Sequence, residues 1–298
     1  MQQVELNDDL SISRIVQGMW RMSSWGFTSE QILSFVEACL TLGIDTFDHA
    51  DIYGDYENEA LFGKAFVQSG VSREEVQLIS KCGIQMTRGR ENKVKHYQYD
   101  TAYIIDSAER SLRMLQTDYL DLFLLHRPSP LLRAEEVFKA VEQLKSSGKI
   151  KQFGVSNFTP SQIALLETNG PVEGNQVECS LLQSSAMLDG TLDDCISGNR
   201  MAMAWSPLGG YFGSDDRPES KERKARMEPL IAELSQKYDC GVSALLLAWL
   251  YKHPAGIHPV VGSTKKGRLA EMLKASEIEM ELQDWFLLWE AARGHRVP

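Results

Sequence analysis

Short hydrophobic segments alternate with amphipathic segments along the whole chain. The hydrophobic segments are rich in β-branched and aromatic residues, and their lengths are typical of buried strands. They lie at Arg14–Gly18, Ile44–Phe47, Val76–Ser80, Tyr119–Leu125, Gln152–Val155, Gly174–Val177, Met201–Trp205 and Ile257–Val261. The pattern therefore predicts eight strands.

The segments between these strands have the spacing of helices. In Ser29–Leu42 apolar residues recur on one face, with Thr28 or Ser29 as N-cap and Gly43 as C-cap. The other predicted helices are Glu57–Gln68, Ala102–Leu115, Ala134–Ser147, Pro160–Glu167, Leu188–Ser197, Lys224–Tyr238, Val242–Lys252, Arg268–Ser276 and Glu281–Ala292. Two polar segments are predicted to be loops: Cys82–Thr101, which would shape a binding face, and Gly209–Glu219, which would be mobile.

Eight strands alternating with helices, without a linker, predict a single parallel (β/α)₈ barrel of the TIM type over residues 1–298. Residues 3–13 predict a short N-terminal hairpin, and Glu281–Ala292 predicts a C-terminal helix. A doubly wound α/β sheet is the alternative. The barrel is favoured because no G-x-G-x-x-G motif follows the first strand.

The composition narrows the class of protein. The 298 residues are 43% hydrophobic and 24% charged, which is typical of a soluble enzyme with a large core. A net charge of -10 argues against nucleic acid and anionic membranes as partners. The first ten residues lack the features of a signal peptide, and the longest apolar run, Ala244–Leu250, is too short to span a bilayer. Five cysteines without a C-x-x-C pair predict reduced thiols in a cytoplasmic protein and no zinc site.

Polar and aromatic residues cluster at the predicted C-terminal ends of the strands, where barrel enzymes carry their sites. Each has an ordinary explanation when it is taken alone: Asp48 and Asn157 could cap turns, and Trp205 could belong to the core. A whole rim of such residues is harder to explain in that way. Asp48, Tyr53, Lys81 and His126 would bring a carboxylate, a phenol, an ammonium and an imidazole together, a set that suits proton donation to a carbonyl oxygen.

The motifs at these positions resemble those of the aldo-keto reductases. They are GIDTFDHADIYGDYENEALFG, ISKCG, LLHRP, GVSNF, NQVE, AWSPLGG and GSTKKGRL, in the order in which that family has them. The resemblance covers almost the whole chain. It implies a barrel that binds a nicotinamide dinucleotide without a Rossmann domain, and a catalytic tetrad of Asp48, Tyr53, Lys81 and His126.

General chemistry explains why such a tetrad would work. A phenol with a pKa near 10 is a weak acid at neutral pH, and a nearby ammonium such as Lys81 would lower the pKa of Tyr53. Asp48 would be the counter-ion of Lys81, and His126 would donate a hydrogen bond to the substrate carbonyl. Tyr53 would then supply the proton while the nicotinamide C4 supplies the hydride.

The resemblance also assigns the cofactor contacts. Ser156, Asn157 and Gln176 would bind the carboxamide, and Trp205 would stack on the nicotinamide. The residues implied for the rest of the cofactor are Gly18, Met19 and Trp20 at the first strand end, Ser206, Leu208, Gly209 and Gly210 at the pyrophosphate, Ser263, Thr264, Lys265 and Arg268 at a 2′-phosphate, and Glu271 at the adenine. The basic cluster predicts NADPH, although a solvated helix start would show the same pattern.

Three functions are compatible with these patterns. The first is reduction of a small-molecule aldehyde or ketone with NADPH, by a monomer or, as an open alternative, a homo-oligomer. The second is a nucleotide-sensing regulatory subunit of the same fold with little turnover. The third is a metal hydrolase that uses His49, Asp51 and His126, although the other strand ends offer no further His cluster. Trp20, Trp25, Tyr56 and the Cys82–Thr101 segment are candidates for the walls of the substrate pocket.

Overall fold

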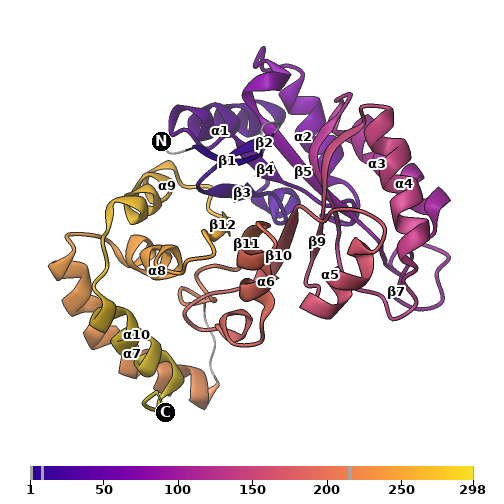
Figure 1. The fold of residues 1–298 in the computed structure, drawn as a ribbon. Coiled ribbons are helices and arrows are strands. Elements are labelled where there is room, and N and C mark those ends of the chain that lie inside the picture. The colour runs from indigo at the N-terminus through magenta and orange to yellow at the C-terminus, as the bar shows by residue number, and fades with distance from the viewer. Residues whose placement is uncertain (1–2, 8–9, 214–216, 298) are drawn as a thin grey trace.

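A closed barrel of eight parallel strands forms the centre of the computed structural model, which describes residues 3–7, 10–213 and 217–297 (Figure 1). The strands are β3 (Val16–Gly18), β4 (Thr46–Asp48), β5 (Gln77–Cys82), β8 (Leu120–Leu125), β9 (Ile150–Ser156), β10 (Gly174–Glu178), β11 (Met201–Trp205) and β12 (His258–Val261). Consecutive barrel strands pair in parallel, and β12 pairs with β3 to close the sheet. The predicted (β/α)₈ barrel is confirmed.

Helices surround the barrel (Figure 1). They are α1 (Ser29–Thr41), α2 (Asn58–Phe66), α3 (Thr101–Leu115), α4 (Ala134–Ser146), α5 (Pro160–Glu167), α6 (Thr191–Ser197), α7 (Pro218–Lys237), α8 (Val242–Tyr251), α9 (Lys266–Leu273) and α10 (Leu282–Arg293). Short 3-10 helices are η1 (Met22–Trp25), η2 (Arg73–Glu75), η3 (Ser185–Met187) and η4 (Lys274–Glu277). Helix α10 is the predicted C-terminal helix. It packs beside α7 at the lower left of Figure 1.

Helix α1 shows how local sequence sets an element. The Thr28 hydroxyl accepts a hydrogen bond from Gln31 N, and the Gln31 side chain accepts one from Thr28 N, which forms a capping box. At the other end Gly43 has a φ of 71°, the left-handed conformation that ends many helices. The helix buries one face, which consists of Ile32, Phe35, Val36 and Cys39.

Side chains fill the interior of the barrel. Along β8, Leu122 and Leu124 belong to the inner cluster, whereas Phe123 and Leu125 belong to the outer cluster between the strands and the helices. This alternation is the two-residue period of a strand. The inner cluster consists of Ile12, Val16, Ile79, Leu122, Leu124, Met201, Met203 and Val260. The barrel is therefore a packed core, and a site must lie at one of its ends.

The predicted N-terminal hairpin covers one end of the barrel. It pairs β1 (Gln3–Asn7) with β2 (Leu10–Ser13) in antiparallel fashion. Ser13 N donates a hydrogen bond to Thr46 Oγ1 at 3.0 Å, and Ser13 O lies 3.3 Å from His258 Nδ1. Thr46 and His258 are the first residues of β4 and β12, so the hairpin covers the N-terminal ends of the strands. A site is therefore expected at the C-terminal ends.

Two predicted helix starts are wrong. Helix α7 begins at Pro218 rather than Lys224. The prediction missed its first turns because they are mostly charged residues exposed to solvent and have no apolar spacing. The predicted loop Gly209–Glu219 therefore ends earlier, and residues 214–216 within it lie outside the described residues. Helix α6 begins at Thr191 rather than Leu188, which is exposed and follows a 3-10 turn.

The segment Cys82–Thr101 is more ordered than a simple loop. It contains a small antiparallel sheet of β6 (Ile84–Gln85) and β7 (His96–Tyr97). The Tyr56 hydroxyl donates a hydrogen bond to Ile84 O and accepts one from Met86 N, each at 3.3 Å. These bonds tie the β6–β7 hairpin to the segment that carries Tyr53.

Helix α8 is apolar on all sides because other helices enclose it. Trp249 is fully buried and stacks on Trp285 of α10 with ring centroids 4.7 Å apart.

Across residues 3–7, 10–213 and 217–297, no helix combines the length and apolar character needed to cross a membrane. All five cysteines are free thiols.

Candidate active site

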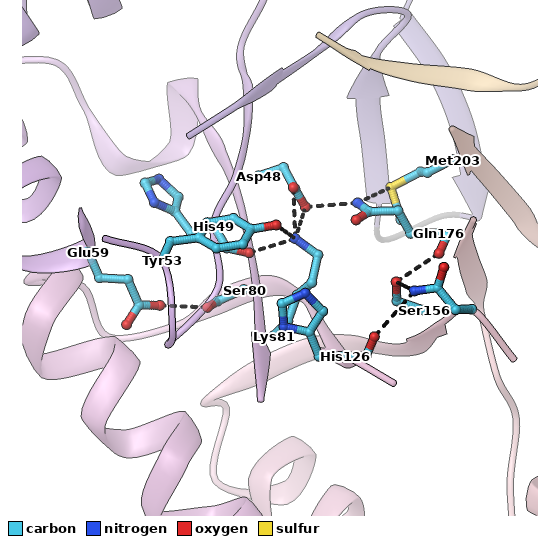
Figure 2. Close-up of polar contacts among 11 residues, drawn as sticks. Asp48, His49, Tyr53, Glu59, Ser80, Lys81, His126, Ser156, Gln176 and Met203 are labelled. Carbon is cyan, nitrogen blue, oxygen red and sulfur yellow. Dashed lines mark hydrogen bonds and ion pairs between the residues drawn. The ribbon is translucent and has the colours of Figure 1, made fainter. Parts of the chain in front are cut away.

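Lys81 and Asp48 form a buried ion pair at the C-terminal ends of adjacent strands. Lys81 Nζ lies 2.7 Å from both carboxylate oxygens of Asp48 and donates to His49 O at 2.8 Å (Figure 2). Burial acts to lower the pKa of Lys81, but Asp48 and Tyr53 together raise it above its ordinary value. The ammonium therefore stays charged, as a buried lysine with a matched counter-ion can.

Tyr53 faces this ammonium from the loop after β4. Its hydroxyl lies 3.1 Å from Lys81 Nζ (Figure 2). Gly54, with a φ of 61°, lets the chain turn here, because a Cβ would stand 2.0 Å from Asn58 Oδ1. Burial raises the pKa of Tyr53, and Lys81 opposes that rise. The expected effect of Lys81 is present, but desolvation exceeds it in the structure.

His126 completes the group of four. It follows β8 and is buried, and its ring meets the Tyr53 ring edge-on at a centroid distance of 5.8 Å. Burial, followed by the charges of Lys81, Arg127 and Lys95, holds the pKa of His126 well below its usual range. Within the described residues its Nδ1 has no hydrogen-bond partner. A neutral imidazole beside a phenol can offer a hydrogen bond to a carbonyl oxygen.

A chain of hydrogen bonds joins Trp205 to the ends of β9 and β10. Trp205 Nε1 donates to Asn157 Oδ1 at 2.9 Å, and Asn157 Nδ2 donates to Ser156 Oγ at 2.7 Å. Ser156 Oγ in turn donates to Gln176 O at 2.8 Å. Asn157 has a φ of 64°, a conformation that asparagine tolerates better than most residues. The half-buried indole of Trp205 is thus held in one orientation at the rim.

Gln176 links this chain to the ion pair. Its Nε2 donates to Asp48 Oδ1 at 2.9 Å, so the carboxylate is bound by Lys81 and Gln176 together (Figure 2). The sequence predicted Gln176 and Asp48 on the rim but could not predict the bond between them, because they lie 128 positions apart.

The loop after β3 is fixed against the same site. Met19 is buried and its backbone N donates to Asp48 O at 2.9 Å, next to Gly18 at the strand end. Asn58 Nδ2 donates to the carbonyl oxygens of Met19 and Trp20, both at 2.9 Å. The Trp20 side chain is 63% exposed. Sequence reasoning missed Asn58, which holds this loop in place.

The model of the Aldo/keto reductase family matches residues 14–292. The chain belongs to this family. Among similar proteins, the oxidoreductase YdhF of Escherichia coli is 42% identical over 96% of this chain and 95% of its own. A 6-dehydroglucose reductase of Agrobacterium fabrum is 39% identical over 100% of both chains. The crystal structure of the thermostable aldo-keto reductase Tm1743 with the inhibitor epalrestat superposes with a TM-score of 0.82, at 25% identity, over 98% of this chain and 100% of that one.

The residues predicted for the phosphates and the adenine lie on the rim of this aldo/keto reductase. Ser206 and Gly210 are exposed with φ values of 51° and 71°, and Leu208 and Gly209 are half-buried beside them. Lys265 and Arg268 are exposed at the start of α9, and Ser263 and Thr264, which precede them in the chain, are half-buried. Glu271 accepts a hydrogen bond from Ala244 N at 3.3 Å and so lies against the start of α8. The adenine role of Glu271 stays a prediction.

A second group of buried polar residues includes Asp51, which the sequence suggested only as a metal ligand, and Glu59, which was not predicted. Asp51 Oδ2 lies 3.1 Å from Ser107 Oγ and 3.5 Å from Arg110. Glu59 accepts a hydrogen bond from Ser80, the neighbour of Lys81 (Figure 2). Burial and the nearby Glu59 raise the pKa of Asp51 to about 7. The sequence did carry a signal for this group, because Asp51 and Glu59 both lie in the motif that contains Tyr53.

This pKa gives Asp51→Asn a pH-dependent effect on stability. Between about pH 4 and pH 7 the folded protein holds a proton on Asp51 that the unfolded chain releases, so this group lowers the stability of the wild type as the pH rises. We expect the melting temperature of Asp51→Asn, relative to wild type, to increase from pH 5 to pH 8. Asp106→Asn, which alters an exposed partner of Arg110, is the control. A difference that is constant with pH would contradict the prediction.

Proposed function

We propose that this chain reduces an aldehyde or ketone to the alcohol with NADPH, and that Tyr53 is the proton donor. One observation carries the proposal: the Tyr53 hydroxyl lies 3.1 Å from the ammonium of Lys81, which two carboxylate bonds from Asp48 hold in place. Membership of the aldo/keto reductase family supports carbonyl reduction as the reaction class.

The proposed proton transfer follows from the charges in the site. As Tyr53 gives up its proton, negative charge develops on the phenol oxygen, and the adjacent ammonium of Lys81 stabilises it. Asp48 and Gln176 keep that ammonium in position. Neutral His126 donates a hydrogen bond to the carbonyl oxygen and orients it toward Tyr53. A bound nicotinamide supplies the hydride.

The residues on the rim fit a nicotinamide dinucleotide. Trp205 offers a flat, half-buried ring whose orientation is fixed by Asn157, which suits stacking. A Cβ added to Gly210 would meet nothing within 4 Å, so the backbone is open to a close ligand there. Lys265 and Arg268 add two exposed cations near the N-terminus of α9, where phosphate binds well. We extend the proposal to NADPH on this basis.

The cofactor proposal predicts selective loss of NADPH binding. Each charged hydrogen bond to a phosphate contributes about 1.5–3 kcal/mol, so Lys265→Ala with Arg268→Ala should weaken NADPH binding by about a hundredfold or more. The affinity for NADH, which lacks the 2′-phosphate, should change little. Quenching of intrinsic tryptophan fluorescence measures both dissociation constants.

A matched control removes two other cations from the same region. Lys266→Ala with Lys274→Ala lowers the net charge equally, and both residues are exposed. This variant should leave the ratio of the two affinities close to the wild-type value. Equal losses for NADPH and NADH in the Lys265/Arg268 variant would mean that the pair supports α9 and does not read the phosphate.

The direct test is oxidation of NADPH by purified protein with a panel of aldehydes, diketones, quinones and sugar-derived carbonyls. Because a 6-dehydroglucose reductase is 39% identical to this chain, an oxidised hexose belongs in the panel. Absence of turnover with tight cofactor binding would instead favour the regulatory alternative.

We further propose that the protein is cytoplasmic and acts as a monomer.

A further inference from the structure

Arg127, the residue after His126, carries an uncompensated positive charge beside the site. Its backbone is held by Tyr99, whose hydroxyl accepts from Arg127 N at 3.2 Å and donates to Arg127 O. The half-buried guanidinium lies 5.5 Å from the centre of the Trp205 ring. No acidic side chain among the described residues forms an ion pair with it. Within the described residues, the tertiary structure therefore leaves this cation without a matching carboxylate.

The charge of Arg127 acts on the residues that would surround the substrate carbonyl. Burial and Lys81 lower the pKa of His126, and Arg127 adds to that lowering. Burial raises the pKa of Tyr53, and Arg127 acts against that rise. His126 and Tyr53 are the two groups that would contact the carbonyl oxygen. Lys95 also acts on His126. The carboxylate of Asp48 is already paired with Lys81. Arg127 and Lys95 therefore add positive charge beside Tyr53 and His126.

More cations lie in the loop between β6 and β7, residues 86–95, which we call the basic loop. Its ten residues include four cations and one acid, in a chain whose net charge is -10. Arg90 stacks over Tyr56 at 3.5 Å, and Arg88 pairs with Asp55 at 3.3 Å. Arg88 and Arg90 line a cavity of about 580 Å³ together with Asp55, Glu91 and Tyr56. Lys95 of the basic loop contributes to the low pKa of His126, so the loop lies within electrostatic range of the proposed site.

We propose that the substrate carries an anionic group, a carboxylate, phosphate or sulfonate, and that Arg127 binds it while the carbonyl faces Tyr53 and His126. The inference rests on the proposed function and adds the substrate class. A guanidinium forms two parallel hydrogen bonds with such groups, and partial burial strengthens them. The basic loop would attract the same anion from solution and raise its rate of association.

The test compares acidic and neutral carbonyls of matched shape. The pairs are 4-carboxybenzaldehyde with benzaldehyde, and glyceraldehyde 3-phosphate with glyceraldehyde, each reduced with NADPH. The readout is the ratio of kcat/KM for the acid to kcat/KM for its neutral partner, which cancels any effect of Arg127 on proton transfer. We expect a ratio well above one in wild type, about 10- to 100-fold lower in Arg127→Ala, and intermediate in Arg127→Lys. The pair that responds identifies the anion.

Controls separate this inference from the proposed function. Arg113→Ala removes an exposed cation from α3 and should keep the wild-type ratio. Equal losses for the acidic and neutral substrates in Arg127→Ala, or a matching loss of NADPH affinity, would overturn the inference and leave the reductase proposal standing. No turnover of any carbonyl by wild type would overturn both.

Discussion

Tyr53→Phe should lower kcat for carbonyl reduction by about 10²–10⁴-fold, the usual contribution of a general acid. Phenylalanine keeps the ring that contacts His126 at 5.8 Å and removes only the hydroxyl that lies 3.1 Å from Lys81. The fold and the affinity for NADPH should therefore be retained. Steady-state kinetics, cofactor titration and circular dichroism measure the three quantities.

The control for this variant is Tyr119→Phe. Tyr119 directly precedes β8 at the opposite, N-terminal end of the strands, packs against Arg73 and Lys151, and loses the same hydroxyl without touching the ion pair. It should keep the wild-type rate. If Tyr53→Phe turned over substrate at the wild-type kcat, the proton would have to come from another group, and the assignment of Tyr53 would be wrong.

Lys81→Met should abolish most activity and also destabilise the protein. The Asp48 carboxylate would remain buried without its cation, a change that costs about 3–5 kcal/mol. Burial already raises the pKa of Tyr53, and the loss of Lys81 would remove the largest effect that opposes this rise, leaving the smaller effect of Arg127. The pH dependence of any residual rate should therefore change. Chemical denaturation and a pH–rate profile measure the two effects.

A second substitution separates the two roles of Lys81. Lys81→Met with Asp48→Asn removes the unpaired charge and keeps an oxygen for the hydrogen bond from Gln176. This double variant should recover part of the lost stability and none of the activity. Wild-type turnover with an unchanged pH profile in Lys81→Met would show that the ammonium does not act on Tyr53.

The alternative functions differ in what they demand of the site. A nucleotide-sensing subunit has no need of the Tyr53–Lys81 contact, whereas a reductase depends on it. A metal hydrolase would need ligands directed at one point, but His49 is buried against Phe62 with ring centroids 4.6 Å apart. In the part of the chain that the structure describes, no three His, Cys, Asp or Glu residues are placed to hold a metal ion. The geometry therefore favours the reductase.

The barrel and its rim could be predicted from sequence because both depend on local information. Strand β11 matches the prediction residue for residue, and Thr28 is one of the two N-caps predicted for α1. Once strands and helices alternate, chain connectivity places every strand end on one rim. Asp48, Lys81 and His126 followed from that rule, and Tyr53 from its place in the loop after the strand of Asp48. The family motifs then assigned all four their catalytic roles.

Only the tertiary structure decided how the charges on that rim are compensated. The Gln176–Asp48 bond joins residues 128 positions apart, and no local pattern reports such a contact. Desolvation depends on what surrounds a group in space, so the raised pKa values of Tyr53 and Asp51 could not be predicted from their neighbours in sequence. The lack of an acidic partner for Arg127 could not be predicted from sequence either. An acidic chain offers an arginine many carboxylates, and only the fold decides which of them come close. Among the described residues the fold brings no acidic partner to Arg127, whose guanidinium lies beside Trp205.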